Sequence, residues 1–140
     1  MKLRTGKSVL TLITAASLAA SSAMAQSATR LEDDAETWER LFITAAANEI
    51  RENCDTIEAR KVAATFYVLG IVRHAKSLGF TMEQIDAFRF DEKNQDRLRQ
   101  RTYAWLDENG VDRSARTGYC ALGDAEIAKN SPIGKLLKRG

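Results

Sequence analysis

The sequence predicts an all-α protein, a compact bundle of five or six helices stapled by one disulfide, after an N-terminal signal peptide. Apolar residues recur at three- and four-residue spacing along most of the chain, and no stretch shows the sustained alternation of a half-buried strand. Helix-capping patterns separate these segments. The single proline is Pro132, so nothing in the preceding residues breaks a helix as proline would.

The composition excludes several classes of function. The 140 residues include 21 Lys+Arg and 19 Asp+Glu, a formal net charge of +2. Lys2, Arg4 and Lys7 are the only charges before residue 26, so the remainder is nearly neutral and lacks the strong basic field that nucleic-acid binding needs. One histidine and two cysteines are too few for a histidine-based catalytic metal site or a four-ligand zinc site. We expect no metal, no cofactor and no nucleic-acid partner.

Residues 1–25 have the three parts of a secretory signal peptide. The basic start precedes an uncharged stretch over residues 8–20, and small residues follow up to Ala23-Met24-Ala25. We expect cleavage before Gln26, which leaves residues 26–140 as a single helical domain. An uncleaved anchor is the alternative, but the apolar stretch is far shorter than the roughly 20 residues that span a bilayer. The sequence therefore predicts an exported, periplasmic protein that does not span the membrane after cleavage.

Cys54 and Cys120 both follow the predicted cleavage point, and export places them in an oxidising compartment. Two cysteines allow one intramolecular pairing, and because the loop it closes is long, it would constrain the unfolded chain by about 4 kcal/mol. A redox pair or an intermolecular bridge is the alternative, but the chain has no Cys-x-x-Cys or c-type haem motif. We expect a structural disulfide that joins the end of the first helix to a late helix.

The first helix is predicted to begin at a capping box, Thr29-x-x-Glu32, and to continue to Ile50. Its apolar residues recur at helical spacing and form one face. They are Leu31, Ala35, Trp38, Phe42, Ala45 and Ala46.

A second box, Asp55-x-x-Glu58, is predicted to open a helix over about residues 57–78, with Gly79 as its left-handed C-terminal cap. Residues 62–72 are apolar nearly all round. That pattern predicts the central, most buried helix of the bundle.

The pattern Thr81-x-x-Gln84 opens a third helix, which either continues or breaks near Asp91 before a polar helix that ends at Asn109-Gly110.

Two more helices are predicted toward the C-terminus. Thr117 caps the first, and Ser131-Pro132 opens a short terminal one, with serine as the N-cap and proline at the first helical position. The terminal helix places apolar residues on one side, with Lys135, Lys138 and Arg139 around them. That pattern fits a partner groove or peripheral contact with an anionic membrane, and packing back on the domain is the alternative. The apolar residues are Ile133, Leu136 and Leu137.

A second candidate surface for partner contact consists of basic residues spaced four apart. On a continuous helix they would form one gradually drifting face, which could bind an acidic partner or be an ordinary solvated surface. The residues are Arg89, Lys93, Arg97 and Arg101.

Two stretches carry a family resemblance: residues 48–60, NEIRENCDTIEAR, and residues 118–137, GYCALGDAEIAKNSPIGKLL. They resemble a family of short exported alphaproteobacterial proteins that is known only as a domain of unknown function. The resemblance implies an all-helical exported domain with these two cysteines, and it implies no catalytic residue. It also links such genes to clusters for the respiratory NADH–quinone oxidoreductase, which implies an accessory or assembly role.

We interpret the chain as a non-enzymatic accessory module that binds another envelope protein. One alternative is an assembly factor of a respiratory membrane complex. Another is a periplasmic chaperone-like protein that exposes apolar surface on acidification or reduction. A third is a small enzyme using carboxylates and His74, which requires a deep pocket around that histidine and a buried acid.

Overall fold

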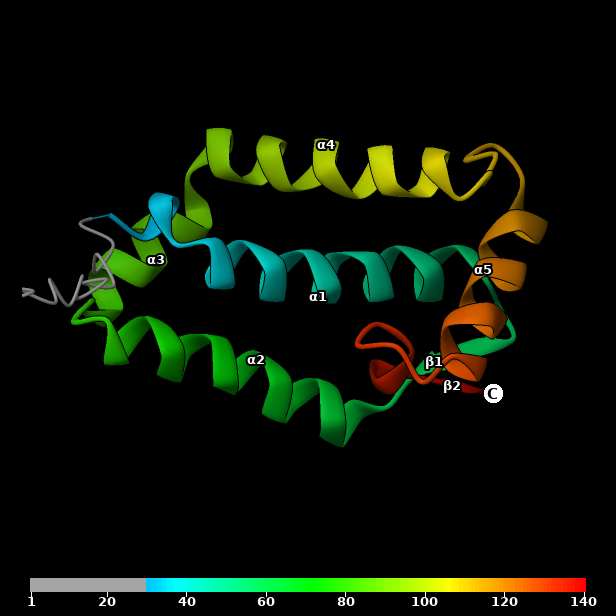
Figure 1. The fold of residues 1–140 in the computed structure, drawn as a ribbon, viewed down its shortest axis with the longest axis horizontal. Helices are drawn as coiled ribbons and strands as arrows, with labels where there is room; N and C mark the ends of the chain where they lie inside the picture. The colour runs from blue at the N-terminus through cyan, green and yellow to red at the C-terminus, as the bar shows by residue number, and fades with distance from the viewer. Residues whose placement is uncertain (1–29) are drawn as a thin grey trace, which may run out of the picture.

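The computed structural model describes residues 30–140, which form five α-helices, two short 3₁₀ helices and a two-stranded antiparallel sheet (Figure 1). The prediction of an all-α bundle with one disulfide is confirmed. The predicted signal peptide and Thr29 lie outside the described residues. In chain order the elements are η1 (Leu31–Asp33), α1 (Ala35–Asn53), β1 (Ile57–Ala59), α2 (Lys61–Ser77), α3 (Met82–Phe90), α4 (Glu92–Glu108), α5 (Arg116–Ala128), η2 (Gly134–Leu136) and β2 (Leu137–Arg139).

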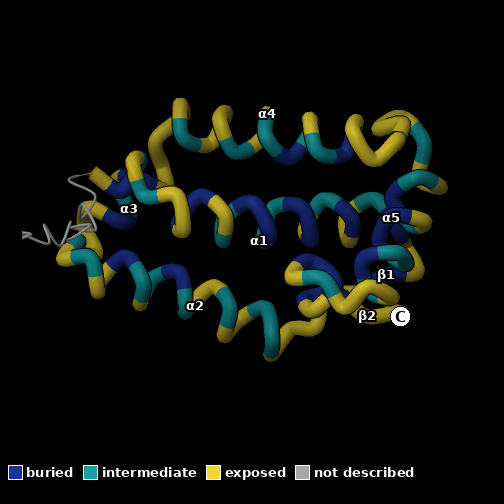
Figure 2. Tube along the Cα trace, viewed as in Figure 1, coloured by how far each residue is buried: buried dark blue, intermediate teal, exposed yellow. Residues whose placement is uncertain are grey.

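α1 is the central helix of the bundle. Figure 1 shows α4 along one side of it and α2 along the other, with α5 across the end where α1 finishes. Figure 2 shows α1 buried over much of its length, whereas α2 is largely exposed or half-buried and contributes only Ile71 and Ala75 to the buried residues. The prediction that the second helix is central is therefore wrong. A helix that is apolar all round can bury one face and still present an apolar face to solvent.

α1 begins later than its predicted capping box. Asp34 is the N-cap, and its carboxylate accepts a hydrogen bond from the backbone N–H of Thr37 at 2.7 Å. The preceding residues form η1 instead, because Asp34 itself supplies the acceptor that a helix N-terminus needs.

The predicted start of the second helix is also wrong. Residues 57–59 form β1, which pairs with β2 in the register Ile57 to Arg139 and Ala59 to Leu137. α2 then begins at Lys61 without a side-chain cap. Because Ile57 is buried and the backbone of β1 pairs with the distant β2, tertiary contacts override the local Asp55-x-x-Glu58 pattern.

The next two helix starts follow the sequence. Thr81 and Gln84 form the predicted capping box of α3. The helix does break at Asp91, whose carboxylate caps α4 by accepting from the N–H of Asn94 at 3.0 Å. Gly79 has a φ of +94°, the left-handed conformation predicted for the residue that ends the second helix.

The last elements depart further from prediction. α5 starts at Arg116 with Ala115 as its N-cap, so Thr117 lies inside the helix and does not cap it. Ser131 does accept a hydrogen bond from the N–H of Gly134 at 2.9 Å, as its predicted cap role requires. The chain that follows makes only η2 before it extends into β2, because its backbone pairs with β1.

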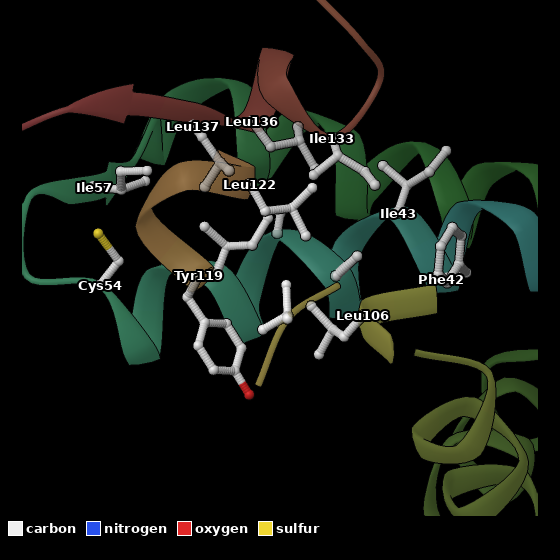
Figure 3. Packing of buried hydrophobic residues seen from close by; sticks show 14 residues of the cluster. Phe42, Ile43, Cys54, Ile57, Leu106, Tyr119, Leu122, Ile133, Leu136 and Leu137 are labelled. Carbon is white, nitrogen blue, oxygen red and sulfur yellow. The ribbon is translucent and has the colours of Figure 1, made fainter. Parts of the chain in front are cut away.

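Two buried clusters fill the bundle. The main core surrounds the C-terminal half of α1, where Ile43 lies with Leu122 of α5 and with Ile133 and Leu136 of the C-terminal segment (Figure 3). At this end the predicted disulfide joins Cys54, the C-cap of α1, to Cys120 of α5, with 5.1 Å between their Cα atoms. The second cluster lies at the opposite end of α1 and is smaller. It contains Leu31, Trp38, Ala75, Ile85 and Phe88.

Candidate functional site

The outer face of α2 gathers large apolar side chains that nothing among residues 30–140 covers. Val62, Phe66 and Leu69 are exposed by 71%, 63% and 49%. Their spacing of four and three residues places them in one row along the helix. Soluble proteins rarely expose large contiguous apolar patches, and where they do, the patch commonly marks an interaction surface.

Two basic residues continue the same row. Arg73 follows Leu69 by four positions and Lys76 follows Arg73 by three, and both are exposed. Neither forms an ion pair with any residue of 30–140. We call this row the α2 stripe; its apolar half is at the N-terminal end of α2 and its basic half is at the C-terminal end. It consists of Val62, Phe66, Leu69, Arg73 and Lys76.

The basic face predicted on the third and fourth helices is not one continuous surface. The break at Asp91 leaves Arg89 on α3, where its guanidinium lies 4.3 Å from the ring centroid of Phe90. Lys93 is exposed on the first turn of α4. A role for these two residues in partner contact stays a prediction.

The other two residues of that face pack against α1. The guanidinium of Arg97 lies 4.0 Å from the ring centroid of Trp38, and that of Arg101 lies 4.3 Å from Phe42. Arg101 also donates to the carbonyl of Trp38 at 3.1 Å and pairs with Glu39. These cation–π and hydrogen-bonding contacts hold α4 on α1, so both guanidiniums already have partners inside the domain.

The C-terminal candidate surface is part of the core. The side chains of Ile133, Leu136 and Leu137 are exposed by only 6%, 5% and 2%. They are therefore not available to a partner or a membrane, and the structure shows the alternative, in which the segment packs back on the domain. β2 fixes this position by pairing with β1.

A pocket of about 160 Å³ lies in the second cluster, where α1, α2, α3 and α4 meet. Its walls are almost entirely apolar, and they include both side chains of an edge-to-face aromatic pair, Trp38 and Phe88, with ring centroids 5.4 Å apart. The indole N–H of Trp38 donates to the carbonyl of Glu32 at 2.8 Å, so the buried ring has its polar atom paired. The pocket can accept an apolar group about the size of a benzene ring.

Thr37 is the buried polar residue of this wall, which also includes Arg89, Asn94 and Gln95. It is 1% exposed, and its hydroxyl oxygen has no hydrogen-bond partner within residues 30–140. A buried hydroxyl without a partner costs about 1–3 kcal/mol. The hydroxyl lies beneath the pocket surface, and the Thr37 side chain helps to lower the pKa of the neighbouring Asp34.

His74 contacts Asp34 beside this pocket but does not line it. Its Nε2 lies 2.8 Å from Oδ2 of Asp34, and its Nδ1 lies 3.6 Å from Glu36. Burial raises the pKa of Asp34, but hydrogen bonds from Thr37 and His74 outweigh it and hold the pKa below its ordinary value. The contact joins the C-terminal end of α2 to the N-terminal end of α1, where the helix dipole of α1 favours the carboxylate of Asp34. We assign it a structural role.

Sequence reasoning missed the α2 stripe because it read residues 62–72 as buried throughout. The positions of Arg73 and Lys76 contained the available signal, since they continue the row of Phe66 and Leu69 and a buried row would not carry two cations. The pocket had no comparable signal, because its walls come from four helices whose packing is not periodic in the sequence.

Two further findings concern the described residues. We find no three His, Cys, Asp or Glu side chains within residues 30–140 placed to hold a metal ion together. No helix in that range has the length and hydrophobicity of a membrane span.

Comparison with known proteins gives one match. The sequence model of a family of unknown function (DUF5333) matches residues 29–138. Neither the curated proteins nor the solved structures contain a match to the chain.

Proposed function

Since the chain belongs to this family of unknown function, we propose from its own geometry that it is an exported accessory module whose α2 stripe binds an acidic, amphipathic segment of another envelope protein. The observation that supports this proposal is the row of Val62, Phe66 and Leu69 exposed along one helix. Met82 and Phe90 of α3 are also exposed, by 44% and 64%, but they stand at opposite ends of that helix and form no row.

The apolar half of the stripe supplies the affinity. Full burial of a valine, leucine or phenylalanine side chain contributes about 1.5–3 kcal/mol relative to its exposed state. Three such residues at positions i, i+4 and i+7 form the kind of row that one helix presents to another. Nothing in the packing of α2 on α1 requires them, because Ile71 and Ala75 provide the buried contacts of that helix.

The basic half of the stripe selects the partner. Arg73 and Lys76 have no ion pair within residues 30–140, so acidic side chains on a partner would complement them without breaking an existing contact. A helix that lies on an anionic membrane carries Lys and Arg along its polar face beside the apolar one. Here the cations follow the apolar residues in the same row, and we therefore favour an acidic protein segment over a lipid surface.

Location in the periplasm is part of the proposal. The signal-peptide pattern of residues 1–25 predicts export, and the Cys54–Cys120 disulfide is the kind of bond that persists in an oxidising compartment. A subunit of a respiratory membrane complex is the more specific partner that the sequence resemblance implies, and it is one outcome of the experiment below.

The experiment places a photo-crosslinking amino acid at Phe66 and, as a matched control, at Gln100, an exposed position on α4. Each variant is expressed in the native host with a tag after Gly140, and the intact envelope is irradiated. We expect one defined protein to crosslink from position 66 and not from position 100. Mass spectrometry then identifies the partner segment, which should combine acidic and apolar residues.

The captured segment is then made as a peptide and its affinity is measured. We expect the variant R73E/K76E to weaken binding at least tenfold at low salt, and high salt to reduce that difference. Crosslinks to lipid would instead favour a membrane surface, and crosslinks to many unrelated proteins would favour the chaperone-like alternative. Identical products from positions 66 and 100 would contradict the proposal.

A further inference from the structure

We infer that the apolar pocket between α1, α2, α3 and α4 receives one large apolar side chain, a leucine or a phenylalanine, from the same acidic segment that binds the α2 stripe. This inference rests on the proposed function and adds to it the residue that anchors the partner. The pocket and the stripe are then two parts of one binding surface, because α2 contributes side chains to both.

The α2 wall of the pocket adjoins the stripe directly. Val72 lines the pocket, and it follows Leu69 by three positions and precedes Lys76 by four. Residues at these spacings are neighbours on the surface of a helix. Val68, the residue before Leu69, also lines the pocket and is nevertheless 44% exposed. A partner segment that covers Leu69 therefore also reaches the edge of the pocket.

The pocket is open to solvent between α2 and α4. Gln95 of α4 lines it and is exposed, as Val68 of α2 is. α2 and α4 lie on opposite sides of α1, whose residues Trp38 and Leu41 contribute to the wall between them (Figure 1). A side chain that projects from a segment bound on α2 can enter the pocket through this opening.

The walls fit an apolar side chain better than a polar group. The volume is about 160 Å³, and an apolar cavity of about 150 Å³ is known to accept benzene. The side-chain amide of Asn94 already donates to the carbonyl of Phe88 at 3.1 Å. That of Gln95 donates to the carbonyl of Arg89 at 3.1 Å. The guanidinium of Arg89 lies over the ring of Phe90, so the polar side chains of the wall have contacts of their own.

The place of the pocket along α2 specifies the order of residues in the partner. The α2 side chains that line the pocket lie between residues 68 and 75, the same part of the helix as Arg73 and Lys76. Val62 precedes Val72 by ten residues, or about 15 Å along the helix axis. The partner should therefore carry its acidic residues beside the anchor residue, with further apolar residues on one side of them to cover Val62 and Phe66.

The first test compares crosslinking from the pocket with crosslinking from the stripe. The photo-crosslinking amino acid is placed at Gln95, and the variants at Phe66 and Gln100 are the positive and negative controls. We expect positions 66 and 95 to capture the same segment, with the crosslink from position 95 at a leucine or phenylalanine. Capture from position 66 alone would overturn this inference and leave the proposed function intact. No capture from position 66 would contradict both.

The second test uses the captured segment as a peptide with the exported, oxidised protein. The chain has two tryptophans, of which Trp38 lines the pocket and Trp105 does not, so their indole N–H signals in ¹H–¹⁵N spectra provide a reporter and an internal control. We expect the peptide to shift the Trp38 signal in a saturable manner. Alanine at the anchor residue should weaken binding at least tenfold and remove this shift. R73E/K76E should weaken binding but keep the shift at saturation, because the pocket is still filled.

Two substitutions that introduce the same ring complete the test. V68F narrows the pocket and should weaken the peptide at least tenfold, whereas Q100F adds a ring at an exposed position of α4 and should leave the affinity unchanged. The peptide with alanine at the anchor residue should bind V68F and the wild type equally, since the two changes remove one contact. Equal affinity of the original peptide for V68F and Q100F, or binding that leaves the Trp38 signal in place, would overturn the inference.

Discussion

The two ends of the bundle are stabilised in different ways. At the end where α1 finishes, a disulfide, a β-bridge and the main core act together, and Ile50 and Leu106 are completely buried there. At the end where α1 begins, the cluster is smaller, α2 is held to α1 by the His74–Asp34 contact, and α4 is held to α1 by the cation–π contact of Arg97 with Trp38.

The two ends of the bundle therefore have different roles: one stabilises the fold, and the other leaves surface available for binding. The pocket belongs to the end that is held by polar contacts, and the exposed α2 stripe extends from beside the sheet toward that end. A binding site needs surface that the fold leaves unpaired, and such surface lowers local stability. The Cys54–Cys120 disulfide at the opposite end offsets this loss of stability, since it stabilises the whole chain without occupying the exposed surface.

The largest expected effect on stability comes from removing the disulfide. The variant C54A/C120A should lose about 4 kcal/mol in the free energy of unfolding, because the unfolded chain regains the freedom of a long loop. Chemical denaturation of the variant and of the wild type, each with and without reductant, measures it. Reductant should lower the midpoint of the wild type alone. Equal midpoints for oxidised wild type and variant would show that the main core holds this end by itself.

A glycine pair gives a matched comparison of the two regions. A Cβ at Gly134 would lie 2.0 Å from the main-chain oxygen of Glu126, so G134A should destabilise the disulfide end by about 3 kcal/mol. Gly70 lies in the interior of α2, where the nearest atom to a new Cβ is 3.6 Å away. G70A should therefore stabilise the protein by up to about 1 kcal/mol, since alanine is the better helix former. Thermal unfolding of both variants checks the opposite signs.

The contact between Asp34 and His74 at the pocket end predicts that the stability of the protein depends on pH. The pKa of Asp34 is lowered in the folded protein, so its stabilising contribution is complete above the pKa of an unfolded aspartate, about 3.9, and is lost as the pH falls through the folded pKa. D34N should lose about 1.5 kcal/mol near neutral pH, because asparagine keeps the cap but lacks the negative charge that Thr37 and His74 stabilise. The difference from the wild type should disappear in strong acid.

The neighbouring carboxylate serves as the control for that experiment. Asp33 is exposed and makes no side-chain hydrogen bond or ion pair within residues 30–140, so D33N should follow the stability curve of the wild type. A D34N variant that is as stable as D33N at every pH would show that the contact between Asp34 and His74 does not hold α2 to α1.

Local signals in the sequence predicted the local features of the fold. The capping box at Thr81 and the left-handed Gly79 each depend on a few consecutive residues, and both are found in the structure. Near Asp91 the sequence allowed either a continuous helix or a break, and the structure has the break. The disulfide was predictable because two cysteines in a chain with a predicted export signal allow one pairing. These features needed no knowledge of how the helices pack.

The predictions that failed depend on contacts between distant segments. The box at Asp55 gave way to β1 because residues 57–59 pair with the last residues of the chain. The apolar run in α2 was placed in the centre because periodicity alone does not say which apolar face remains uncovered. Arg97 and Arg101 resembled a free basic face until the structure placed aromatic rings of α1 beneath their guanidiniums.

The smallest expected effect concerns two buried threonines whose hydroxyls differ in one respect. Thr102 is 2% exposed and its hydroxyl donates to the carbonyl of Leu98 at 2.9 Å, whereas the hydroxyl of Thr37 has no partner within residues 30–140. T102V should therefore lose about 1 kcal/mol, and T37V should gain up to about 1 kcal/mol because it removes an unpaired polar group. Urea denaturation of both variants checks the signs. If T37V also destabilises, the Thr37 hydroxyl is paired in solution with the neighbouring carboxylate of Asp34.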